Sequence, residues 1–70
     1  MKYVYVIEQA DDGSFSAYVP DLPGCTTSGN SVEEIRLSIK DAVDSYVESL
    51  REHNEPVPAP GSAVDVVDAA

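Results

Sequence analysis

The side chains that could do chemistry in this 70-residue chain are its carboxylates, one cysteine and one histidine. Metal-dependent hydrolysis needs several carboxylates that converge on two ions about 3.5–4 Å apart. Only Glu8 and Asp21 fall near the ends of expected strands, and most acids of the expected helix have a spacing that turns them toward solvent. We therefore expect solvated carboxylates, with no metal site and no catalytic residue.

Cys25 and His53 are the other pair of residues that could take part in catalysis. A nucleophilic cysteine needs a nearby base and a third group that orients the base, and the sequence identifies no such group. We expect Cys25 to be a small core residue, because free cysteine is among the most buried residue types. His53 falls at a helix end, where its protonated form interacts favourably with the macrodipole. The chain is predicted to be no enzyme and to need no cofactor.

The charge balance restricts the class of partner. The chain has 13 Asp and Glu against 4 Lys and Arg, a formal net charge of −9. Affinity for a phosphate backbone comes from clustered Lys and Arg, which four dispersed cations cannot supply. We expect no direct nucleic-acid binding by this chain, and a basic partner instead.

Length and cysteine content limit how the chain is stabilised. Residues 1–70 are predicted to form a single domain, and chains near this size bury only about 60% of the surface that unfolding exposes. One cysteine cannot form an internal disulfide, and no cluster of metal ligands is visible. Small scaffolds without these supports depend on association, so we predict self-association.

The apolar content places the chain among folded proteins, because 43% of its residues are hydrophobic. The longest apolar run, Tyr3 to Ile7, is far shorter than the ~20 residues of a membrane-spanning helix, and no secretory signal pattern precedes it. We expect a cytoplasmic protein with no membrane association.

Three strands are predicted in the first half of the chain. Residues 2–9 are β-branched and aromatic on both faces, which favours a central strand or one buried in a dimer. An Asp12-Gly13 turn then leads into residues 14–19, where Phe15, Ala17 and Val19 share the expected core face. After a rigid Pro20–Gly24 loop, residues 25–28 are predicted to add a third antiparallel strand.

A long amphipathic helix follows. Ser31 and Glu34 form an S-x-x-E capping box, with Asn30 and Glu33 as an alternative register. One apolar stripe continues to Leu50 and predicts packing against the sheet, whereas Leu37 projects opposite that stripe and is a weak candidate for a contact. Prolines end the helix before residue 56, and the valines at 64–67 could form a short edge strand before a frayed end.

These elements together resemble the HicB antitoxin family. The resemblance is carried by the run DGSFSAYVPDLPGC from Asp12 to Cys25, by Gly29, by SVEE at Ser31–Glu34 and by EPVP at Glu55–Pro58. It implies an α+β domain with a partial ribonuclease H-like fold, in the order β-β-β-α-β with the helix across an antiparallel sheet. It also implies dimers or tetramers.

The resemblance further implies a role. HicB proteins bind and neutralise HicA, a small basic ribonuclease that cleaves mRNA and uses a histidine, and many carry a separate DNA-binding segment. No such segment follows the valines at 64–67, so DNA binding is not expected here. The alternative is an orphan structural or ligand-binding domain of the HicB type with no toxin partner.

The candidate partner-binding residues are an exposed tyrosine, a preorganised loop and an acidic helix face. They are Tyr18, Pro20, Asp21, Leu22, Pro23, Gly24, Asp41, Asp44 and Glu48. The loop loses little entropy on binding because two prolines restrict it, and the acids complement a basic toxin. The structural alternatives are a tight crossover for the loop and a solvated face for the helix.

Overall fold

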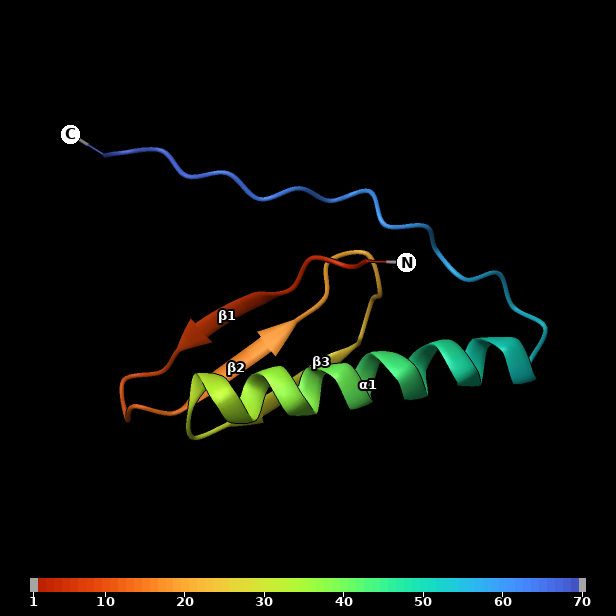
Figure 1. Ribbon diagram of the computed structural model, residues 1–70, viewed down its shortest axis with the longest axis horizontal. Coiled ribbons are helices and arrows are strands. Elements are labelled where there is room, and N and C mark those ends of the chain that lie inside the picture. Colours follow the sequence, from red (N-terminus) through yellow and green to blue (C-terminus); the bar gives the residue numbers. More distant parts are fainter. Residues whose placement is uncertain (1, 70) are drawn as a thin grey trace.

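A tight turn at residues 11–13 joins the first two strands of the structure, a computed structural model that describes residues 2–69 (Figure 1). These strands are β1 (Val6–Gln9) and β2 (Phe15–Tyr18). The amide of Ala10 donates to the carbonyl of Ser14 at 2.8 Å, and Gly13 has φ of 90°, a conformation that glycine adopts without strain. The predicted hairpin is confirmed.

The sheet has the order β1-β2-β3, with β3 (Thr26–Gly29) antiparallel to β2. The expectation of a central first strand is therefore wrong, because β2 is central and β1 lies at an edge. The strand also begins at Val6 and not at residue 2, since no neighbouring strand pairs with residues 2–5 in the described part of the chain. The alternative of an edge covered by a second copy stays a prediction.

Helix α1 (Val32–Glu52) begins at the predicted cap. The amide of Glu34 donates to Ser31 Oγ at 3.1 Å, and the Glu34 carboxylate accepts from the amide of Asn30. Ser31, and not Asn30, is thus the N-cap. At the other end His53 is the C-cap residue, with Nδ1 2.7 Å from the carbonyl oxygen of Ser49.

Removal of this cap gives a measurable loss of stability. We expect Ser31→Ala to lower the free energy of unfolding by about 1 kcal/mol, because the Glu34 amide loses its acceptor. Chemical denaturation followed by circular dichroism measures the change. Ser45→Ala, at an exposed position within α1, is the matched control and is expected to cause no loss. Equal losses in the two variants would contradict the capping role.

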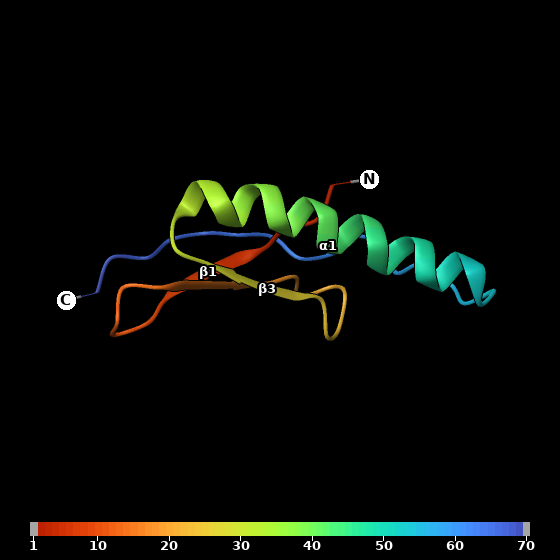
Figure 2. The same ribbon diagram turned by 90° about the horizontal axis from the view of Figure 1, so that it is seen from below.

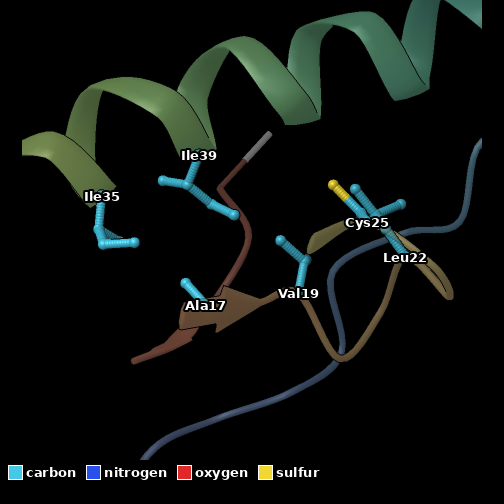
Figure 3. Close-up of a cluster of buried hydrophobic side chains, with 6 residues drawn as sticks. All are labelled: Ala17, Val19, Leu22, Cys25, Ile35 and Ile39. Atoms are coloured by element: carbon cyan, nitrogen blue, oxygen red, sulfur yellow. The ribbon is translucent and has the colours of Figure 1, made fainter. Parts of the chain in front are cut away.

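The core lies between α1 and one face of the sheet (Figures 2 and 3). Its six buried residues are Ala17, Val19, Leu22, Cys25, Ile35 and Ile39. Alternation along β2 sends Ala17 toward the helix and Tyr18 to the opposite face, where Tyr18 is 40% exposed. The predicted core face of the second strand is confirmed, and α1 covers only one side of the sheet.

The segment after α1 contains no helix or strand as far as residue 69. The predicted strand at the 64–67 valines is therefore wrong. Its physical reason is the lack of a pairing partner: no backbone hydrogen bond among the described residues joins this segment to the free edge of β1. The segment runs past that edge in an extended form (Figure 1).

The order of elements is thus β-β-β-α within residues 2–69, an α+β arrangement with a three-stranded antiparallel sheet. Among the described residues, no helix is both long enough and apolar enough to cross a membrane.

Candidate partner-binding surfaces

The loop between β2 and β3 is closed by its own backbone. The amide of Val19 donates to the carbonyl of Cys25 at 3.1 Å, and the amide of Cys25 donates to the carbonyl of Leu22 at 3.0 Å. Tyr46 Oη on α1 donates to the carbonyl of Pro23 at 2.7 Å. These bonds fix the loop against the helix, so it has a single defined shape before any partner arrives.

The members of this loop differ in exposure. Pro20, Pro23 and Gly24 are exposed, and Gly24 has φ of 83°. Leu22 is 0% exposed and packs in the core. The side chain of Leu22 is therefore not available for contact at the surface, although the sequence places it among the partner-binding candidates.

Asp21 holds the segment after the helix. One carboxylate oxygen accepts from the amides of Gly61 and Ser62 at 3.1 and 3.0 Å, and the other accepts from Ser62 Oγ at 3.1 Å. A second contact joins Tyr3 Oη to the carbonyl of Pro58. Hydrogen bonds from the backbone of Ser62 and Gly61 lower the pKa of the Asp21 carboxyl below its ordinary value.

The Asp21 contact makes attachment of this segment depend on pH. Because the folded pKa lies below the unfolded value of about 3.9, the contact contributes fully above that value and is lost as pH falls through the folded pKa. Amide exchange at Gly61 and Ser62 is therefore expected to accelerate in acid. At neutral pH, Asp21→Ala is expected to accelerate it roughly tenfold.

Hydrogen exchange followed by NMR measures the effect of acid pH and the effect of Asp21→Ala on these two amides. Asp11→Ala removes another exposed carboxylate, in the hairpin turn, and is expected to leave both amides unchanged. Exchange at Gly61 that is the same in Asp21→Ala and in the unaltered chain would rule out the carboxylate as the anchor.

The acidic residues of α1 form a stripe on its outer face. Asp41, Asp44 and Glu48 are all exposed and lie one to two turns apart on the side away from Ile35 and Ile39. Leu37, 74% exposed, lies on the same outer face about one turn before Asp41. We call these four residues, Leu37, Asp41, Asp44 and Glu48, the acidic stripe.

The acidic stripe retains most of its negative charge. Across residues 2–69 the single ion pair joins Lys40 Nζ to Asp44 Oδ2 at 3.0 Å, and both side chains are exposed. Such surface pairs contribute little. An exposed leucine beside three carboxylates combines an apolar anchor with long-range attraction for cations, which suits contact with a basic protein.

The predicted candidates do not form one continuous surface. Tyr18 lies on the uncovered sheet face beside Ser16, Thr26 and Ser28, the loop lies at one end of the sheet, and the acidic stripe lies on the outer side of α1. Sequence reasoning missed the two contacts that hold the last segment. Their partners are 41 and 55 residues apart, and no local pattern signals such pairs.

Cys25 and His53 occupy the structural positions expected for them. Cys25 is buried, and burial raises the pKa of its thiol, which disfavours the nucleophilic thiolate. His53 caps the helix. Within the described residues 2–69, no three His, Cys, Asp or Glu side chains lie close enough to hold a metal ion.

Comparison with known proteins gives a family for this arrangement. The family described as HicB-like antitoxin of bacterial toxin–antitoxin system matches residues 3–70. A UPF0150 protein of Thermoplasma acidophilum is 45% identical over 58 residues, which cover 83% of this chain and 84% of that protein. A UPF0150 protein of Synechocystis is 38% identical, covering 80% of this chain and 71% of that protein.

A named antitoxin is also among the relatives. Antitoxin HicB 1 of Photorhabdus laumondii is 33% identical over 61 residues, 87% of this chain but only 39% of that longer protein. The family match extends over nearly the whole sequence, including the closed loop and the helix that carries the acidic stripe. The chain belongs to the HicB-like antitoxin family of bacterial toxin–antitoxin systems.

Proposed function

We propose that this protein is an antitoxin that neutralises a small basic mRNA-cleaving ribonuclease of the HicA type by covering it. The observation that carries the proposal is the exposed acidic stripe on a member of an antitoxin family. A ribonuclease that binds RNA presents cations, and a rigid surface of opposite charge competes for them. Neutralisation then requires tight contact and no chemistry, in keeping with a non-enzymatic protein.

The acidic stripe is the proposed main contact. Its carboxylates accelerate encounter with the toxin, and Leu37, which is 74% exposed, supplies apolar surface that contact would bury. Exposed Pro20, Pro23 and Gly24, together with Tyr18, are proposed as a secondary contact. Asp21 and Leu22 act within the molecule, because one anchors residues 61–62 and the other fills the core.

The remaining features of the proposal follow from the same role. The toxin acts on mRNA, so the antitoxin is placed in the cytoplasm. Residues 1–70 are proposed to act as one domain of partial ribonuclease H-like fold, which the β-β-β-α order of the described residues supports in its first four elements but not in a final strand. With a net charge of −9 the chain does not bind nucleic acid itself.

Co-expression tests the proposal. We expect a gene for a short basic protein beside the gene for this chain, and expect the two products to co-purify at low salt. Expression of the basic protein alone is expected to arrest growth and degrade mRNA, and co-expression of this chain is expected to restore both. Absence of such a neighbour, or failure of the pair to associate at low salt, would favour an orphan domain with no toxin partner.

A further inference from the structure

A groove of about 280 Å³ lies between the start of the chain and α1. Tyr3, Tyr5 and Val43 supply apolar lining, and each is only partly buried. Arg36 and Lys40, one helical turn apart, supply positive charge, and Asp44 on the same rim pairs with Lys40 at 3.0 Å. Two of the four Lys and Arg residues in a chain of net charge −9 thus line one groove. Because Lys40 pairs with Asp44, Arg36 is the cation left to attract an acidic group, and the groove favours an apolar occupant that carries a carboxylate.

The chain contains a segment of that character. Asp21 holds Gly61 and Ser62, so the unattached part begins at residue 63. Beyond it the sequence reads Val-Asp-Val-Val-Asp from 64 to 68. The three valines are 68%, 85% and 90% exposed, and residues 63–69 form neither helix nor strand. We call residues 63–69 the arm.

We propose that the arm of one copy docks in the groove of a second copy, and that the exchange is reciprocal. In an extended chain Val64, Val66 and Asp68 point to the same side. Two valines then face Tyr3, Tyr5 and Val43, and Asp68, about 6–7 Å beyond Val66, reaches the cations on the rim. The arm spans roughly 20 Å when extended.

A second copy fits better than the chain's own arm. In the structure the arm runs past the free edge of β1 with its valines in solvent, and its own groove is open (Figure 1). Among residues 2–69 the core has six buried residues. Burial of further apolar surface between two copies would add stability that the small core of a domain of this size does not supply. A two-fold exchange fills both grooves with identical contacts.

The dimer is tested by sedimentation over a range of concentrations at about 0.15 M salt. Val66→Asp places a charge in the groove and is expected to raise the dimer dissociation constant at least tenfold. Ala69→Asp adds the same charge to the arm outside the Val64–Asp68 contact and is the matched control. Both positions are exposed, so circular dichroism is expected to show an unchanged fold. A monomeric unaltered chain, or equal effects of the two variants, would overturn the proposal.

A charge exchange tests the pairing itself. Arg36→Glu and Asp68→Arg are each expected to weaken the dimer several-fold, and the double variant is expected to recover most of the loss, because the opposite charges are restored. Failure of the double variant to recover would overturn the assignment of Asp68 to Arg36 or Lys40.

Cross-linking separates the two copies. Mixed chains carrying Arg36→Cys or Asp68→Cys, distinguished by mass, are expected to form a mixed disulfide under mild oxidation. A chain carrying both substitutions that closes its disulfide internally and sediments as a monomer would show that the arm occupies its own groove, and would overturn the exchange. The antitoxin role does not depend on this result.

Discussion

Leu22→Ala is expected to lower the free energy of unfolding by about 2–5 kcal/mol, the largest single effect that the structure predicts. Leu22 is 0% exposed and belongs to the cluster that joins the loop to Ile35 and Ile39 of α1. Removal of three carbon atoms leaves a cavity that the closed loop cannot easily fill. In a domain of this size the loss approaches the whole stability.

The measurement is urea denaturation of the variant, with Pro23→Ala as its control. Pro23 is the exposed neighbour in the same loop, and its bond to Tyr46 uses a carbonyl that alanine retains. The control is expected to change stability by less than about 1 kcal/mol. A change of that small size in Leu22→Ala would show that Leu22 is not a core residue.

Toxin binding distinguishes the two roles considered for Leu22. If Leu22 acts through the core, the loss of toxin binding follows the fraction of unfolded chain. An added osmolyte then restores folding and toxin binding together. A folded Leu22→Ala chain that fails to bind toxin would instead identify a direct contact. The structure favours the first result, because no part of the Leu22 side chain reaches the surface.

Local patterns in the sequence predicted the elements whose causes are local. The Asp12-Gly13 turn, the Ser31 cap and the apolar spacing of the helix each act within a few residues, and each is present in the structure. The position of a strand within the sheet does not follow from local patterns. Residues 2–9 are apolar on both faces, which is expected both of a central strand and of an edge strand that a partner covers. The sequence therefore could not distinguish these two positions.

The long-range contacts explain the remaining errors. Val64, Val66 and Val67 have high β-propensity, but a strand needs a hydrogen-bonded neighbour, and Asp21 holds the chain at Ser62 without placing the valines beside β1. The sequence predicts that Asp21 belongs to the partner-binding loop. Its role depends on a residue 41 positions away, which no spacing rule identifies.

Reversal of charge on the acidic stripe is the second large expected effect. Asp41→Lys combined with Glu48→Lys changes the charge of the stripe by four units while leaving the core face of α1 untouched. We expect the association rate with the basic ribonuclease to fall by about 10-fold to 100-fold at low salt, because steering of the encounter is lost.

The control must separate the effect of charge on the acidic stripe from the effect of the total charge of the chain. Asp11→Lys combined with Glu55→Lys makes the same total change at exposed positions off the stripe. Association followed at two salt concentrations, with a ribonuclease inactivated at its catalytic residue, gives both rate and salt dependence. We expect the stripe variant to show the larger loss at low salt and a flatter salt dependence. Equal slowing in both double variants would mean that overall charge alone attracts the toxin.

Leu37→Ala completes the test of the stripe, because it changes apolar contact without changing charge. Leu37 is 74% exposed in the free chain, so the substitution is expected to leave stability within about 0.5 kcal/mol. In the complex it is expected to increase the dissociation rate roughly tenfold or more, while the association rate stays the same. A stripe whose acids govern association and whose leucine governs dissociation is a docking surface. If the charge-reversal variant slows association but Leu37→Ala leaves the dissociation rate unchanged, the toxin contacts another part of the chain. The acidic residues of the helix would then act only by long-range electrostatic attraction.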